Sequence, residues 1–181
     1  DVVPGRFVNH ALMVAHEVGH ALHALESRSP EPPGALVGET VACWASLVTG
    51  TSLAAAGGDG SQALALALGD TLVEELFVSG AVSSFEDAVY LLVRNGSGVT
   101  VAALDEAWLA VHRELLGSVV EVPAHVGSGW ARLPSLATDP GHALSYVWAT
   151  VLALAIDARH AGDAEVPARS PPRSHLPRQR R

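Results

Sequence analysis

The stretch that decides the fold is AHEVGHALH, residues Ala15–His23. It lies in an apolar run that we expect to form one helix from about Pro4 to Glu26, because proline suits the first turn of a helix. Three prolines between Ser29 and Gly34 forbid the helix from continuing. The stretch therefore lies in the second half of a helix, and the chain can turn back against it in the next one.

Helical periodicity prevails along the rest of the chain, and strand-like alternation is scarce. We expect further helices at about Ala35–Val48, Ser61–Val93 with a possible break near Gly80, Val101–Leu116 and Gly141–Ala158. Residues 118–134 should be irregular, since they hold two prolines and two glycines and directly follow Gly117. The predicted fold class is all-α, with the helix of the first stretch packed on the second helix.

His16, Glu17 and His20 form an HExxH motif. Residues four apart lie one above the other on a helix, so both imidazoles can reach one ion, and zinc accepts two such nitrogens with at least one further ligand. Glu17 projects beside the pair, where it can act as general base towards an activated water. The motif thus predicts His16 and His20 as zinc ligands and Glu17 as a catalytic residue. The alternative is an incidental glutamate between two histidines on a helix face.

Glu39 is the candidate third ligand. It falls within the second predicted helix among apolar residues such as Val41 and Trp44, and burying an unpaired carboxylate is costly. Coordination of zinc would supply a reason for its position, and a motif followed by a distant glutamate is the gluzincin pattern. The alternative is a solvated glutamate on an amphipathic helix. His23 also falls on the metal face, but we expect it beside the ligands or in the core.

Composition restricts the classes of partner. The net charge is −8, and residues 1–158 carry 17 of the 19 acidic residues but 5 of the 11 arginines. An acidic body argues against nucleic acid as a partner, because phosphate binding needs clustered basic side chains. The longest apolar run, Ala143–Ile156, is too short to span a bilayer. With Cys43 as the single cysteine and no signal peptide, we expect a cytoplasmic protein that does not bind membranes.

Several segments resemble the thimet oligopeptidase and oligoendopeptidase F family of zinc metallopeptidases. The first is Ala15–His23, which other gluzincins would share. The order and spacing of the later segments narrow the choice: Phe77–Glu86, Val99–Trp108, Gly129–Pro134 and Pro140–Trp148. The resemblance covers about residues 8–158.

The resemblance implies a helical zinc endopeptidase that hydrolyses short peptides. His16, His20 and Glu39 would be the ligands and Glu17 the general base. Tyr146 matches a tyrosine that stabilises the tetrahedral intermediate, a role in oxyanion stabilisation; the alternative is a core aromatic on an apolar helix. His142 lies near a tyrosine of the family that this chain lacks, and is a candidate substrate-binding residue in its place.

The sequence also departs from the family. Ser135-Leu136-Ala137 replaces a His-Phe-Tyr segment, and the large N-terminal helical region of the family has no counterpart. We expect a catalytic domain at residues 1–160 that is incomplete on its N-terminal side, followed by a disordered Pro/Arg-rich tail at residues 161–181. The apolar surface left bare predicts self-association. Two alternatives stay open: a degenerate zinc-binding paralogue without turnover, and a small gluzincin specific for one protein substrate.

Overall fold

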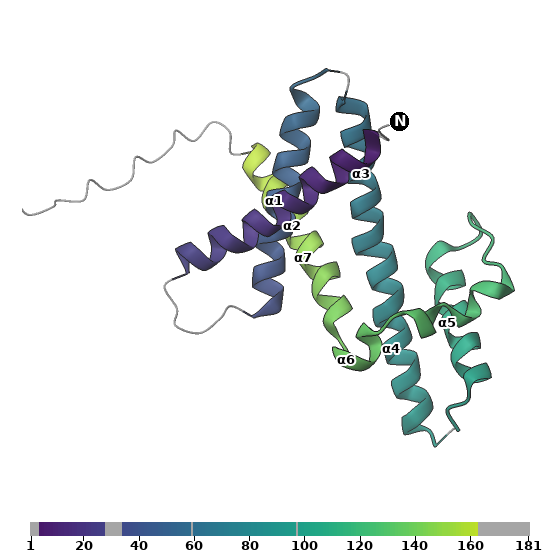
Figure 1. Ribbon diagram of the computed structural model, residues 1–181. Coiled ribbons are helices and arrows are strands. Elements are labelled where there is room, and N and C mark those ends of the chain that lie inside the picture. The colour runs from purple at the N-terminus through teal and green to yellow at the C-terminus, as the bar shows by residue number, and fades with distance from the viewer. Residues whose placement is uncertain (1–3, 28–33, 59, 97, 163–181) are drawn as a thin grey trace, which may run out of the picture.

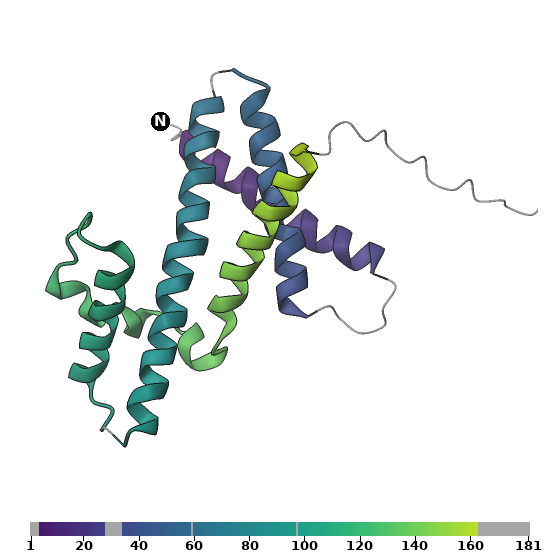
Figure 2. The same ribbon diagram turned by 180° about the vertical axis from the view of Figure 1, so that it is seen from behind.

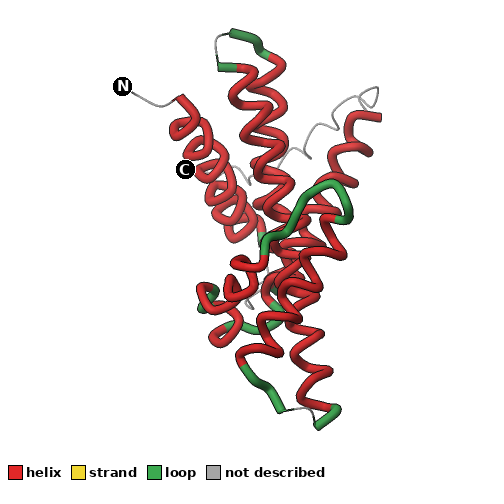
Figure 3. Tube along the Cα trace, turned by 90° about the vertical axis from the view of Figure 1, so that its right-hand side faces the viewer, coloured by secondary structure: helices red, strands yellow, loops and turns green. Residues whose placement is uncertain are grey.

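The computed structural model describes residues 4–27, 34–58, 60–96 and 98–162, and within these ranges it contains helices and no strand (Figures 1 and 3). The prediction of an all-α chain is confirmed for this part. The elements, in order, are α1 (Pro4–Glu26), α2 (Ala35–Ala55), α3 (Ser61–Val73), the π-helix η1 (Glu74–Val78), α4 (Ser79–Arg94), α5 (Val101–Leu116), the 3-10 helix η2 (Ala124–Arg132), α6 (Ser135–Thr138) and α7 (His142–Gly162).

The last helix ends at Gly162 rather than near Ala158, and two further predictions need a larger correction. The second helix does not stop near Gly50 but runs on to Ala55. Gly50 is buried, and a Cβ there would lie 3.0 Å from the Leu12 side chain and 3.4 Å from that of Leu68. The glycine therefore makes room for α1 and α3 rather than ending a helix.

The second correction concerns Gly80, which lies inside a helix and does not break it. Residues 61–94 form one continuous helical rod, in which α3 passes through η1 into α4 (Figure 1). The irregularity is the π-helix Glu74–Val78, which ends before Gly80. The segment expected to be irregular, residues 118–134, contains the 3-10 helix η2. Of the predicted tail, residues 163–181 lie outside the described residues, whereas 161 and 162 end α7.

Helix α2 organises the half of the molecule that holds the motif. It packs against α1 and against α7, and both views of the ribbon show α1 crossing it obliquely (Figures 1 and 2). A small apolar cluster of Leu12, Leu64 and Ala67 joins α1 to α3. The rod α3–η1–α4 thus closes one side of the α1–α2 pair, and α7 contacts α2, η1 and α4.

A second cluster holds the remaining helices on the far end of the rod. Phe85 of α4 meets Trp108 of α5 edge to face, with ring centroids 5.1 Å apart. The Trp130 indole of η2 donates a hydrogen bond of 2.8 Å to the Asp105 carboxylate. The Gly141 N–H donates to the Glu86 carboxylate at 3.0 Å, which ties the start of α7 to α4. These contacts fix the position of α7 and of Tyr146 on it.

Large apolar side chains also lie on the surface. Met13, Val14, Val18, Leu22 and Leu25 form an exposed row along α1, with Leu25 81% exposed. Self-association through such a surface stays a prediction.

The rod Ser61–Arg94 is long and apolar enough, by length and composition alone, to cross a membrane. Glu74 and Glu75 lie near its middle, where a bilayer would make carboxylates costly.

Candidate metal centre

The crossing of α1 over α2 is set by a glycine inside the HExxH motif. Gly19 is buried, and a Cβ on it would lie 2.7 Å from the Cα of Ala42 and 3.0 Å from the Cβ of Ala45. Only the absence of a side chain lets the two backbones approach this closely. On the same interface, the Ser46 hydroxyl donates a buried hydrogen bond of 2.8 Å to the Leu12 carbonyl. The two helices are therefore fixed on each other by backbone contact next to the motif.

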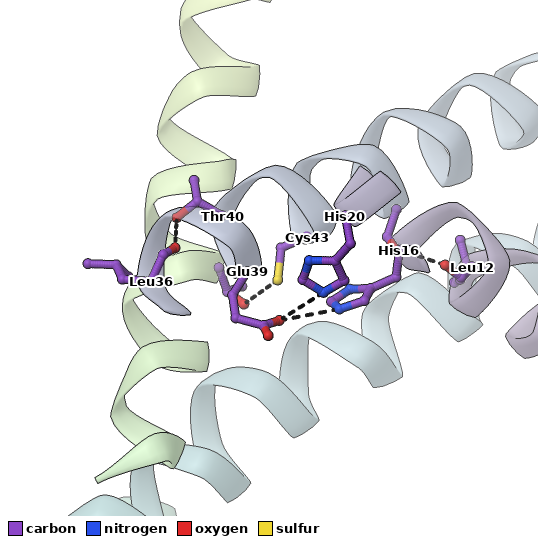
Figure 4. Close-up of polar contacts among 9 residues, drawn as sticks. Leu12, His16, His20, Leu36, Glu39, Thr40 and Cys43 are labelled. Carbon is purple, nitrogen blue, oxygen red and sulfur yellow. Dashed lines mark hydrogen bonds and ion pairs between the residues drawn. The ribbon is translucent and has the colours of Figure 1, made fainter. Parts of the chain in front are cut away.

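This crossing brings the three predicted ligands together (Figure 4). The Oε2 atom of Glu39 lies 3.3 Å from Nε2 of His16 and 3.7 Å from Nε2 of His20. One ligand atom from each residue lies within 4.8 Å of the other two. The two imidazole rings stand nearly perpendicular, at 80°, with centroids 4.8 Å apart. Two nitrogens and one carboxylate oxygen therefore converge on one point between α1 and α2.

The burial of the Glu39 carboxylate and its lack of a hydrogen-bond donor fit a cation at that point. Its side chain is 12% exposed, and Oε2 is buried and accepts no hydrogen bond from the described residues, although two imidazole nitrogens are close to it. A buried carboxylate oxygen without a donor is costly. An ion between the three side chains would satisfy Oε2 and both nitrogens at once. Two histidines and a carboxylate are the donor set of catalytic zinc sites that keep a coordination position open.

Glu17 lies on the exposed side of α1, next in sequence to His16. Its carboxylate is near enough to Tyr146 that its charge is one of the causes that raise the pKa of the tyrosine. The predicted general base thus directly follows a predicted ligand in the sequence, but its side chain does not line the adjoining pocket.

An open pocket of about 480 Å³ adjoins the metal site on the side of the rod. His16 and Met13 contribute from α1, Glu75 from η1 and Tyr146 from α7. The pocket thus connects a predicted ligand with the predicted catalytic tyrosine. Glu75 was not foreseen, although a Glu-Glu pair within an otherwise apolar helical run is a signal that could have indicated it.

Burial and neighbouring acidic residues raise the pKa values of two side chains that line this pocket, Glu75 and Tyr146. Burial, followed by the charges of Glu74 and Glu39, raises the pKa of Glu75 to about 7. Burial, followed by the same Glu39 charge and that of Glu75, also raises the pKa of Tyr146. Tyr146 therefore keeps its hydroxyl proton at neutral pH and can act as a hydrogen-bond donor.

The candidate substrate-binding residue His142 contacts Tyr146. The two rings meet edge to face, with centroids 4.9 Å apart. Nδ1 of His142 lies 3.4 Å from a carboxylate oxygen of Asp139. His142 is thus one turn of α7 away from the pocket-lining tyrosine and does not itself line the pocket.

Cys43 and His23 are not part of the converging group of His16, His20 and Glu39. Cys43 accepts a 3.9 Å contact from the Thr150 hydroxyl, and burial raises the pKa of its thiol to about 11, which keeps it protonated. A neutral thiol is a poor metal ligand. The Nε2 atom of His23 is buried and has no hydrogen-bond partner among the described residues, and His23 does not belong to the converging group.

Comparison of the chain with protein families, with curated proteins and with solved structures found no match. The resemblance to the oligopeptidase family therefore stays a prediction, and the functional argument depends on the geometry of these side chains.

Proposed function

We propose that the chain is a zinc-dependent peptidase that hydrolyses peptide bonds of short peptides. The observation that carries the proposal is the convergence of His16, His20 and Glu39 around an otherwise unsatisfied carboxylate oxygen. The open pocket beside His16 gives a peptide access to this point. Zinc as the metal, peptide as the partner and the cytoplasm as the location are parts of the same proposal.

Each residue of the site would have its own part in the reaction. Zinc held by His16, His20 and Glu39 would supply Lewis-acid chemistry towards the scissile carbonyl and the attacking water. Glu17 accepts a proton from the attacking water and delivers it to the leaving nitrogen. The protonated Tyr146 hydroxyl, which α7 contributes to the pocket, donates a hydrogen bond to the oxygen on which negative charge develops. His142 supports Tyr146 through its ring contact, rather than contacting substrate.

A second candidate is a zinc-binding protein without turnover. The observation that favours it is the exposed position of Glu17, outside the walls of the pocket. In that case zinc would serve the structure of the α1–α2 pair. The two candidates differ in what Glu17 does and agree on the ligands.

The test combines metal content with hydrolysis of an internally quenched peptide library. We expect one zinc per chain and peptide turnover by the wild type. Glu17→Gln should keep the zinc and lose about 10²–10⁴-fold in turnover, the range of a general base. Glu26→Gln, an exposed change at the end of the same helix, is the matched control and should leave turnover intact. Zinc without turnover, with Glu17→Gln indistinguishable from wild type, would favour the second candidate.

A further inference from the structure

The pocket beside His16 has one wall that the proposed reaction does not use. This wall is the middle of the rod, where Thr71, Glu75 and Ser79 succeed one another at intervals of four residues. Asn9 and Ser46 add polar groups from α1 and α2, and Glu74 contributes at the rim, where it is exposed. Among the residues whose side chains the structure describes, no arginine lines the pocket, and the sequence contains no lysine.

Glu75 is the unexplained group on this wall. It is only partly exposed, and within the described part of the chain no hydrogen bond or ion pair reaches its carboxylate. The charges that act on it come from Glu74 and Glu39, both acidic. While it is ionised, a partly buried carboxylate that meets only like charges among the described residues lowers the stability of the fold, and a cationic group of a ligand would offset this loss.

The local backbone is specialised at the same place. Glu75 belongs to the π-helix Glu74–Val78, the single π-helix of the described residues. A π-helical turn is less favourable than an α-helical one, and such turns frequently occur at functional sites. The distortion and the unpaired carboxylate therefore coincide at the pocket that His16 also lines.

We propose that Glu75 selects peptides with a cationic side chain, arginine or lysine, close to the bond that is cleaved. The inference rests on the proposed peptidase function and adds a substrate class to it. A guanidinium or ammonium group in the pocket would pair with Glu75 while the peptide backbone reaches the metal site past His16. Peptides with an acidic side chain at that position would meet Glu75 and Glu74 and be rejected.

Peptides that differ only in charge test the proposal. Quenched peptides carry arginine, its neutral isostere citrulline, lysine, norleucine or glutamate at each position around the cleaved bond. At one position, the wild type should show kcat/KM at least about tenfold higher for arginine than for citrulline, the lower range for a close charge pair. Glu75→Gln should abolish this preference by lowering kcat/KM for the arginine peptide to the value for the citrulline peptide. Asp70→Asn, an exposed acid five residues earlier on the rod, is the matched control and should keep the preference.

Binding without turnover separates this inference from the peptidase proposal. N-acetylarginine methylamide and its citrulline counterpart are titrated into the zinc-loaded full chain and followed by ligand-observed NMR. Selective binding of the arginine compound that Glu75→Gln removes would support the cation pocket even if no peptide were cleaved.

Three results would overturn the inference. Equal cleavage of arginine and citrulline peptides would do so while leaving the peptidase proposal intact. Equal loss of turnover on every peptide in Glu75→Gln would assign Glu75 to the reaction itself instead of selectivity. Equal weak binding of both small compounds by a chain without turnover would contradict both proposals.

Discussion

The Oε2 atom of Glu39 lies 3.3 Å from Nε2 of His16, although the two residues belong to different helices. The distance is determined by the contact of Gly19 with Ala42, where α1 crosses α2. The ligand geometry and the helix packing are therefore one structural feature, and a change in either should alter the other.

Removal of the Glu39 charge tests the third ligand. Glu39→Gln keeps the shape of the side chain but loses the anionic oxygen between the two imidazoles. We expect the affinity for zinc to fall by at least about 100-fold, the upper range for the loss of a group that only supports a ligand. Competition with a chromophoric chelator measures the affinity. Asp70→Asn is the control, and an unchanged affinity in Glu39→Gln would exclude this residue as a ligand.

Gly19→Ala tests the close helix crossing. The added Cβ would lie 2.7 Å from the Ala42 backbone, so α1 and α2 must move apart. We expect the free energy of unfolding to fall by about 1–3 kcal/mol, as in other overpacked cores. Zinc affinity should fall in parallel.

Gly80→Ala is the matched substitution for that experiment. A Cβ at Gly80 has nothing within 4 Å, and the residue lies inside α4. Alanine should therefore raise the free energy of unfolding by about 0.5–1 kcal/mol, because glycine weakens a helix interior. Urea denaturation followed by circular dichroism measures both variants, and equal effects of the two substitutions would refute the importance of the crossing.

Chelation of the metal should leave the helices formed. Contacts that do not involve the predicted metal ligands hold α1 on α2 and α3. Among them are the Ser46–Leu12 hydrogen bond and the cluster of Leu12, Leu64 and Ala67. We expect the far-ultraviolet circular dichroism spectrum to be unchanged after dialysis against a chelator, with the melting temperature lowered by the lost binding energy. Unfolding on chelation would instead indicate a structural zinc site, because metal affinity is then folding energy.

Stability should depend on pH through Glu75. Its pKa is raised from 4.5 to about 7 in the folded chain, because the fold favours the protonated carboxyl group. The resulting contribution to the free energy of unfolding is fully present below about pH 4.5 and is lost as the pH rises through 7. In the metal-free protein, Glu75→Gln should be more stable than wild type above pH 7, by an amount on the order of 1–3 kcal/mol. The difference should disappear near pH 4.5. Urea denaturation across this range measures it, and a constant difference would contradict the assignment.

Tyr146→Phe tests the proposed hydrogen bond to the developing oxyanion. Because the pKa of Tyr146 is raised, its hydroxyl stays protonated at neutral pH and is available as a donor. We expect kcat to fall by about 10²-fold with little change in KM, as when a donor to the transition state is removed. Tyr90→Phe, on an exposed tyrosine of α4, is the control. A change confined to KM would place Tyr146 in substrate binding instead.

Sequence patterns foresaw the parts of the structure that depend on short-range order. The i, i+4 spacing of His16 and His20 fixes both on one helix face, and the bounds of α1 result from a proline at one end and a proline-rich segment at the other. Glu39 could be added because a carboxylate among apolar residues needs an explanation. The structure brings these three residues together, and zinc itself stays a prediction.

The features that the sequence did not predict depend on tertiary contacts. Gly50 resembles a helix terminator until Leu12 and Leu68 are seen packed against it. Glu75 faces the metal pocket only because the rod folds back beside α1, and the π-helix that carries it has no known signature in the residue order. Neither can be deduced from periodicity along a single segment.

The backbone contact at Gly19 has a consequence for the choice of metal. Because α1 and α2, which carry the ligands, already contact each other, an ion entering the site does not need to order the chain around it. Little conformational entropy is therefore lost on binding. The nitrogen-rich, three-atom donor set would favour small tetrahedral ions such as zinc over calcium, which requires six to eight oxygen ligands. The donor atoms would thus select the class of ion, and the absent side chain at Gly19 allows the two helices to bring those atoms together.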